Sequence, residues 1–242
     1  MATAQTAVPS TVPAPSPVRV IEIDGPIMPS LVGKIRAALE PIDSERFPAG
    51  AIVLLDSPGG DGLAAMEVGR IVRAAKAHVL VRVRCASACV YILAGGVVRG
   101  VARDRAIAIH KPRLTTFVKG IGVVDINSAS NPKAAQALEA GDRRSREYFK
   151  EMGMPDSLYP AMMAAPSDQA RYLELAELPA LGLAGVDPAY RAARAAAAAA
   201  HYRISEDEFV HRTNEVAQKC LVDKLSGRDL VRCYSRLLQT GG

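Results

Sequence analysis

One short segment constrains the fold of this chain more than any other: an apolar run that ends in glycines. Residues 51–55 read AIVLL, and the chain continues as DSPGG over 56–60. An unbroken apolar run of this length is typical of a strand buried on both faces of a sheet. Apolar residues then recur at helical spacing from Leu63 to Val72. A buried strand that leads through a glycine turn into a helix indicates a parallel sheet with helical connections.

The same alternation continues on both sides of this run. The patterns predict strands over 18–23, 51–55, 79–83, 97–98 and 106–109, and helices over 30–39, 63–72, 85–94, 133–152 and 178–186, the last of them short and closing on a glycine turn. Such a rhythm predicts an α/β fold with parallel strands and right-handed crossovers. The less regular segment 115–132 fits either a hairpin or a mobile loop.

Composition divides the chain into three parts. Residues 1–17 are rich in Pro, Ala, Thr and Ser, and we expect a disordered arm there. Residues 18–186 carry the strand–helix alternation, and residues 187–242 carry only helical patterns, which indicates a C-terminal helical extension. Hydrophobic residues make up 49% and charged residues 23% of the chain, as in an ordinary globular protein. This composition excludes a collagen, a wholly disordered chain and a small disulfide scaffold.

The charge pattern and the chain start bear on partners and location. The formal net charge is +5, without a block of five or six like charges, so we expect no nucleic-acid partner. No apolar run approaches the ~20 residues that a membrane span requires, and the start of the chain does not resemble a secretory signal. As written, the sequence predicts a cytoplasmic protein, or a periplasmic one if a signal was trimmed. We see no ATPase segment, so an ATP-dependent partner would be a separate protein.

Four cysteines lie in two pairs along the chain, at Cys85, Cys89, Cys220 and Cys233. They form no Cys-x-x-Cys motif, and no histidine lies near the first pair, so we expect neither a metal nor another cofactor. In an oxidising compartment the first pair could form a disulfide if its Cα atoms lie within ~7 Å, which would leave the second pair to form another. The alternative is four small buried thiols.

Three chemically suggestive motifs each follow an expected strand. They are Gly59-Gly60, Ser87 within CASAC at 85–89, and His110 after AIAI at 106–109. The carboxyl ends of parallel strands are where α/β sheets bind ligands. Backbone N–H groups, a serine and a histidine there could act as oxyanion donors, nucleophile and base. Taken singly, each motif is equally well a tight turn, a helix cap or a packing histidine.

Taken in order, the motifs DSPGG at 56–60, ASA at 86–88 and IHKP at 109–112 resemble the Clp-type serine peptidases. That fold is shared with crotonases and signal peptide peptidases, and the resemblance covers roughly residues 18–186. It is closest to a branch, predicted to be periplasmic, with Cys-x-Ser-x-Cys around the nucleophile. The resemblance implies a repeated β-β-α superhelix, Ser87 as nucleophile and His110 as general base. It also implies an oxyanion hole built from the N–H groups of Ala88 and of Gly59 or Gly60.

The acid of the triad is harder to place. The family carries it shortly before an Arg-aromatic-Leu stretch, which RYL at 171–173 matches. A gapless match puts Pro166 at that position, so Asp168 is our candidate and Asp156 the second choice. Asp168 is equally well a helix cap. Lys111 is a poor alternative base, since neighbouring side chains in an extended chain point to opposite sides.

We therefore expect a serine peptidase that acts on peptides or unfolded proteins. One alternative is a catalytically silent Clp-like scaffold that oligomerises or binds peptides, and another is a crotonase-like acyl-CoA enzyme. The long segment 115–152, which includes the helix expected over 133–152, would match the family's handle, which mediates subunit contacts. Because the segments 115–132 and 187–242 have no counterpart in stacked rings, we expect a small homo-oligomer.

Overall fold

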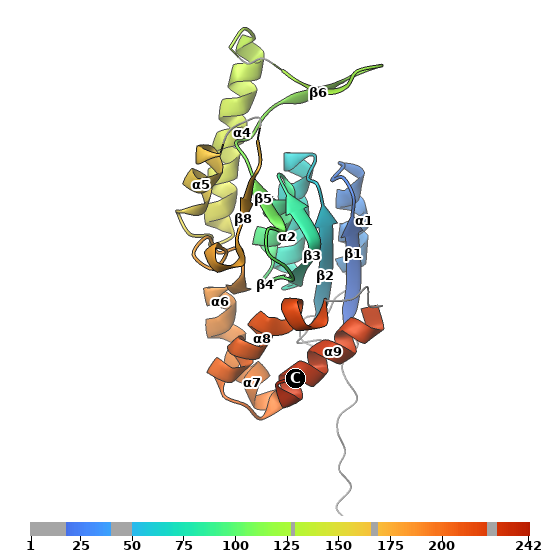
Figure 1. Ribbon diagram of the computed structural model, residues 1–242, viewed down its shortest axis with the longest axis vertical. Coiled ribbons are helices and arrows are strands. Elements are labelled where there is room, and N and C mark those ends of the chain that lie inside the picture. The colour runs from blue at the N-terminus through green and yellow to red at the C-terminus, as the bar shows by residue number, and fades with distance from the viewer. Residues whose placement is uncertain (1–17, 40–49, 127–128, 166–168, 222–226) are drawn as a thin grey trace, which may run out of the picture.

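The computed structural model describes residues 18–39, 50–126, 129–165, 169–221 and 227–242. It is an α/β structure in which helices cover a mixed sheet (Figure 1). The sheet strands are β1 (Arg19–Asp24), β2 (Ala51–Ser57), β3 (His78–Ala86), β4 (Val98–Val101), β5 (Ile107–Ile109), β8 (Arg171–Leu173) and β9 (Gly185–Val186). A separate hairpin pairs β6 (Thr115–Val118) with β7 (Gly122–Asp125). The longer helices are α1 (Ser30–Leu39), α2 (Gly62–Ala74), α4 (Pro132–Glu151), α8 (Glu206–Cys220) and α9 (Gly227–Thr240). The shorter ones are α3 (Cys89–Gly95), α5 (Leu158–Ala164), α6 (Pro188–Tyr190) and α7 (Ala196–Tyr202).

The sheet is parallel in its centre and antiparallel at its margins. Strands β1 to β4 lie side by side in chain order and are parallel, as the strand–helix alternation predicts. The first half of the long strand β3 pairs with β4, and its last residues pair with β5. Strands β8 and β9 are antiparallel to β5 and β4. Strand β3 therefore ends beside β5, which brings the predicted serine and histidine motifs to adjacent strand ends.

One face of the sheet packs against the helices that connect the strands. Ile23, Val53, Leu55, Val79 and Val81 point to this face and belong to one buried cluster with α1, α2 and α3. These residues alternate along their strands, because side chains of a strand point to opposite faces in turn. This cluster is the larger part of the core.

The C-terminal helices cover part of the other face. Ile52, Leu54 and Leu80 alternate with the residues above, and they pack with buried side chains of α8 and α9 such as Phe209 and Leu230. Both faces of β2 are thus covered, which explains its unbroken apolar run. The described residues after Asp187 form helices α6, α7, α8 and α9, and α8 and α9 pack directly on the sheet.

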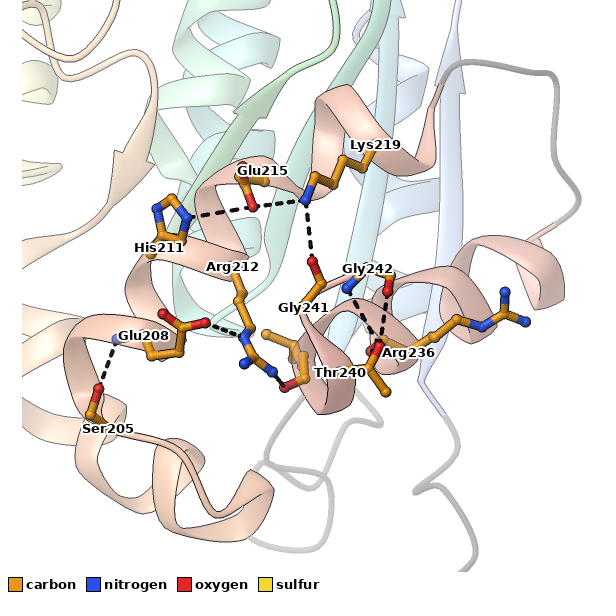
Figure 2. Close-up of polar contacts among 11 residues, drawn as sticks. Ser205, Glu208, His211, Arg212, Glu215, Lys219, Arg236, Thr240, Gly241 and Gly242 are labelled. Atoms are coloured by element: carbon orange, nitrogen blue, oxygen red, sulfur yellow. Dashed lines mark hydrogen bonds and ion pairs between the residues drawn. The ribbon is translucent and has the colours of Figure 1, made fainter.

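Polar contacts fasten the C-terminal helices to each other (Figure 2). The Arg212 guanidinium on α8 donates to the Glu208 carboxylate and to the carbonyl of Leu238 at the end of α9. The Lys219 ammonium donates to the carbonyl of Gly241. A disulfide joins Cys220 on α8 to Cys233 on α9, with the Cα atoms 5.8 Å apart. This pairing is the one that the sequence allowed.

A buried charged cluster connects the start of the C-terminal segment to the core. The Asp187 carboxylate lies 3.0 Å from the Arg73 guanidinium and 3.3 Å from that of Arg99. Burial opposes ionisation of Asp187, but the Tyr190 N–H and the two arginines outweigh it and hold its pKa below the ordinary value. Burial also lowers the pKa of Arg99 to about 10, with a contribution from the neighbouring Arg73. The charged groups of Arg73, Arg99 and Asp187 thus form one ion-pair cluster between α2, β4 and the start of α6.

Two helix predictions need correction. Residues 178–186 form turns and strand β9 instead of a helix, because Gly182 and Gly185 have positive φ angles of 68° and 115° that interrupt helical geometry. The helix predicted over 85–94 begins only at Cys89, since Cys85 and Ala86 belong to β3. Of the two alternatives for 115–132, the structure has the hairpin. Within the described ranges, no helix is long and apolar enough to cross a membrane.

Candidate active site

The turn after β2 is held in place by hydrogen bonds to Ile27. The Ile27 N–H donates to the Gly59 carbonyl over 2.8 Å, and the Asp61 N–H donates to the Ile27 carbonyl over 2.9 Å. Gly59 and Gly60 have φ angles of 100° and 142°, and a Cβ atom on Gly60 would lie 2.3 Å from the Ile27 oxygen. Only glycine fits both the backbone angle and this close approach.

The two glycine N–H groups of this turn differ. The Gly59 N–H donates to the Ser57 hydroxyl over 3.1 Å. The Gly60 N–H makes no hydrogen bond among those of the described residues, because the bonds to Ile27 use the groups on either side of it. Of the two glycines that the sequence offered as oxyanion donors, Gly60 is therefore the one with a free N–H.

Ser87 occupies a sharp turn between β3 and α3. Its φ angle is +56°, in the left-handed region that a serine rarely adopts and that costs ~1–3 kcal/mol. Its N–H donates to the Ala108 carbonyl on β5 over 3.0 Å. Gly59 packs against this turn so closely that a Cβ atom there would lie 2.6 Å from the Ser87 Cβ. The serine and the glycine turn are thus in direct contact.

Helix α3 starts immediately after the serine. Ala88 is its N-cap residue and supplies no side-chain hydrogen bond to the first turn. The Val90 N–H donates to the Ser87 carbonyl and the Tyr91 N–H to the Ala88 carbonyl, both over 3.1 Å. In the described part of the chain the Ala88 N–H itself has no acceptor. A second free backbone N–H therefore lies at the residue that follows Ser87.

A disulfide encloses the serine turn. Cys85 at the end of β3 and Cys89 at the start of α3 are bonded, with the Cα atoms 5.2 Å apart. Both residues are fully buried. This pair also matches the pairing that the sequence allowed.

His110 follows the strand that pairs with the end of β3. Ala86 and Ala108 are register partners, so His110 lies close to the serine turn along the neighbouring strand. Its Nδ1 atom lies 2.8 Å from the Lys111 carbonyl oxygen. A carbonyl oxygen only accepts, so the neutral tautomer that fits this contact has the proton on Nδ1 and the lone pair on Nε2. Within the described ranges, no hydrogen bond joins His110 to Ser87.

Among the described residues, no carboxylate forms a hydrogen bond or an ion pair with His110. Both Asp168 and Pro166 lie outside the described residues. Asp156 is exposed in the turn before α5, and within the described ranges it makes no hydrogen bond or ion pair with His110. Two partners of site residues could not be found from the sequence: the Lys111 carbonyl and the Ser57 hydroxyl. Every residue has a carbonyl, and a hydrogen bond within a local turn requires no recognisable motif.

Exposed apolar side chains surround this edge of the sheet. Met28 follows Ile27, Leu63 is the second residue of α2, Val83 lies in β3 and Tyr172 pairs with Ala108 in the sheet. All four are large hydrophobic residues between 41% and 57% exposed. In the part of the chain that the structure describes, no group of three or more His, Cys, Asp or Glu residues could hold a metal ion.

Comparisons with known proteins give matches among solved structures only. No protein-family model matches the chain, and no curated protein does. One solved structure that it resembles is the 1510-N membrane-bound stomatin-specific protease in a mutant form, at 18% identity and a TM-score of 0.49. That match covers 71% of this chain and 79% of the other. A second mutant of the same protease, in complex with a substrate peptide, matches at 18% identity and a TM-score of 0.49, covering 69% and 73% of the two chains.

Proposed function

We propose that this protein is a serine-type peptidase that cleaves peptide bonds through an acyl-enzyme on Ser87. The observation that carries the proposal is the serine turn itself. Ser87 has a left-handed backbone at the carboxyl end of a central strand, in contact with Gly59 and beside the free N–H groups of Gly60 and Ala88. Backbone strain of this kind persists where the surroundings enforce it, and such sites are often functional.

In this reaction the Ser87 Oγ atom attacks the carbonyl carbon of the scissile peptide bond. The proton of the hydroxyl passes to Nε2 of His110 and then to the leaving nitrogen, as the carbon–nitrogen bond breaks. Water then attacks the acyl group and restores the serine. The Nδ1 bond to the Lys111 carbonyl favours this role, because it leaves Nε2 unprotonated.

The negative charge on the substrate oxygen would be stabilised by the N–H groups of Gly60 and Ala88. Both are backbone donors without another acceptor among the described residues. Removal of one such donor costs ~10²–10³ in rate in a serine peptidase. Gly59 has a different part in this proposal: its bond to Ser57 fixes the turn.

An acid beside the histidine is not required for proton transfer. In a triad the acid orients the imidazole and sets its tautomer without taking its proton. The Lys111 carbonyl already sets the same tautomer. We propose a serine–histidine pair as the reacting groups, with Asp168 as the candidate third member.

The surface around the serine suits a peptide substrate with apolar side chains. Met28, Leu63, Val83 and Tyr172 are exposed there, although large hydrophobic residues gain from burial. An unfolded or extended peptide presents both apolar side chains and a backbone that could pair with strand ends. We therefore expect peptides as substrates, in preference to acyl-CoA.

Hydrolysis of a mixed peptide library tests the proposal. We expect Ser87→Ala to lower the rate by several orders of magnitude, because it removes the nucleophile. Ser157→Ala is the matched control, since Ser157 is an exposed serine that bonds the Ala180 carbonyl. Equal hydrolysis by wild type and Ser87→Ala would contradict the assignment. Peptide binding without hydrolysis would favour the silent scaffold, and turnover of acyl-CoA the crotonase-like alternative.

The assembly remains a prediction. The upper part of α4 and the β6–β7 hairpin extend beyond the sheet (Figure 1), as expected of a subunit handle. Of the apolar residues expected on this helix, Tyr148 and Phe149 pack against Tyr91 in the core, whereas Leu138 is only half-buried. We propose a small homo-oligomer that uses the projecting part. Light scattering tests this, and either a monomer or a tetradecamer would contradict it.

A further inference from the structure

We propose that the Cys85–Cys89 disulfide is a positioning element of the candidate active site. In this inference the bond holds the turn that carries Ser87 in its reactive shape, so the serine reacts efficiently only in the oxidised protein. The inference rests on the proposed function, in which Ser87 is the nucleophile.

The side chains of the turn do not stabilise its shape, so contacts from outside the turn must hold it. A left-handed serine is unfavourable, and the alanines at 86 and 88 have no polar side-chain atoms that could bond the turn. Helix α3, which follows, has only seven residues and no side-chain cap at its start. A helix of this length is not stable by itself in water. Release of this segment would let Ser87 leave the left-handed region.

The disulfide connects the two fixed ends of this turn. On one side, the Cys85 N–H donates to the Ala106 carbonyl over 2.7 Å, and Cys85 pairs with Ile107 in the sheet. On the other side, Cys89 is the first residue of α3 and is fully buried. Ser87 is the middle residue of the five. With its neighbours joined at a Cα separation of 5.2 Å, the turn has few other conformations available.

The position of Gly59 adds a reason for tight control. Its Cα group packs against the Ser87 Cβ, the Ala86 oxygen and the Ala88 nitrogen, all within 3.1 Å of where a Cβ atom would lie. A small shift of the serine turn would therefore change its distance from the glycine turn and from the Gly60 N–H. Displacements of about 1 Å at reacting groups can cost ~10²-fold in rate.

The second disulfide provides a matched control within the same chain. Cys220–Cys233 joins α8 to α9, and the residues of that region in Figure 2 include none of the candidate site residues. Its removal deletes a bond of the same kind without touching the turn. A general effect of disulfide loss on the fold would therefore appear in both double variants, whereas a positioning effect would appear in one.

The test measures inactivation of the full chain by a fluorophosphonate. In this reaction an Oγ–P bond forms, the P–F bond breaks, fluoride leaves and the hydroxyl proton passes to the base. We expect the maximal inactivation rate of Cys85→Ala/Cys89→Ala to fall at least ten-fold, with the half-saturating probe concentration within two-fold of wild type. Cys220→Ala/Cys233→Ala should keep both values within two-fold. A lower maximal rate at an unchanged half-saturating concentration indicates that the serine is mispositioned, whereas a weakened binding surface would raise the half-saturating concentration.

A second measurement serves if the first variant does not fold. In the Cys220→Ala/Cys233→Ala protein, a dithiol reductant can act only on Cys85–Cys89: two thiols form there, and the reductant becomes a cyclic disulfide. Mass spectrometry of alkylated peptides gives the reduced fraction. We expect the inactivation rate to fall in proportion to that fraction and to recover on reoxidation.

The outcomes separate this inference from the function beneath it. Rapid labelling of Ser87 in wild type and equal labelling after loss of Cys85–Cys89 would overturn the inference and leave the peptidase proposal intact. Equal loss in both double variants would also overturn it, because the effect would then lie in the fold as a whole. Absence of Ser87 labelling in the oxidised wild type would overturn both.

Discussion

The two ends of the central strands are built in different ways. At the amino ends, both faces of the sheet are covered, and His78, Arg99 and Asp187 are buried there with partners. At the carboxyl ends, the chain turns sharply through Gly59, Gly60 and Ser87, all with positive φ angles. Among the described residues, large apolar side chains are exposed around these turns but not at the opposite end of the same strands.

This difference shows where the fold can sustain strain. Unfavourable backbone conformations persist only when the surrounding structure determines them. Strand β3 takes part in both regions, because it begins at His78 under the C-terminal helices and ends beside Ser87. We therefore expect the packed amino ends to support the strained carboxyl ends of the same strands. If this division is correct, changes at one end should alter stability and changes at the other should alter reactivity.

The largest effect that we expect is at the reactive end. His110→Ala should reduce peptide hydrolysis by ~10²–10⁴-fold, because it removes the residue that we propose as the general base. Lys111→Ala is the control: it deletes a neighbouring cation but keeps the carbonyl that bonds Nδ1, so activity should stay within a few-fold. Steady-state kinetics of the two variants measure this. A severe loss in Lys111→Ala with little loss in His110→Ala would reverse the assignment of the base.

At the packed end, Asp187→Asn should strongly destabilise the protein. It leaves the charges of Arg73 and the buried Arg99 without their carboxylate, and loss of one partner from a buried pair costs ~3–5 kcal/mol. Asp207→Asn removes the charge of a side chain that is 92% exposed in its pair with Arg191, and water screens such a pair, so the free energy of unfolding should hardly change. Urea unfolding compares the two. If Asp187→Asn and Asp207→Asn lost similar amounts of unfolding free energy, burial of the charged cluster would not matter for stability.

Stability should also fall in acid because of His78. This imidazole is fully buried beside Tyr190 and Tyr234, and burial lowers its pKa from 6.5 to about 4. The unfolded chain therefore takes up this proton first, so the contribution is complete above pH 6.5 and is lost as pH falls towards 4. At 1.36 kcal/mol per pKa unit, the loss amounts to about 3 kcal/mol.

The difference in unfolding free energy between wild type and His78→Phe, followed from pH 7 to pH 4, isolates this effect. As the pH falls, wild type should lose more unfolding free energy than His78→Phe does. His211→Ala serves as control, because His211 is exposed on α8. A pH-independent difference for His78→Phe would contradict the burial argument.

The smallest contrast concerns the two disulfides. By chain entropy, a bond across 13 positions stabilises by about 3 kcal/mol and one across four positions by about 2 kcal/mol. Thermal unfolding should therefore be affected somewhat more by loss of Cys220–Cys233 than by loss of Cys85–Cys89. Reactivity of Ser87 should instead be affected more by loss of Cys85–Cys89 than by loss of Cys220–Cys233. If the same disulfide had the larger effect on both thermal unfolding and reactivity, the distinction between the two ends of the strands would be lost.

Much of the fold could be predicted from the sequence, because its strongest signals are local. The apolar run at 51–55 and the helical spacing after it predict β2 and α2 correctly, and the run also requires a cover on both faces. The sequence does not reveal that α8 and α9 provide the second cover, since this depends on contacts between distant residues. The error at 178–186 has the same origin: Leu-rich spacing suggested a helix, but Gly182 and Gly185 permit turns.

The candidate site was less predictable than the fold. Motif order placed Ser87 and the two glycines in one region, and the structure brings Gly59 into contact with Ser87. The order of the motifs could not show which glycine N–H is free, because that depends on the Ser57 hydroxyl. Nor could it show that a backbone carbonyl bonds His110, since every residue carries one.

The central claim is that Ser87 is an activated nucleophile, and one measurement tests it most directly. Oxidised wild-type protein is treated with a fluorophosphonate, and the modified residue is identified by peptide mass spectrometry. We predict a single adduct on Ser87 that is absent from Ser87→Ala and still forms in Ser157→Ala. No adduct on Ser87, or an adduct on another serine that persists in Ser87→Ala, would contradict the account.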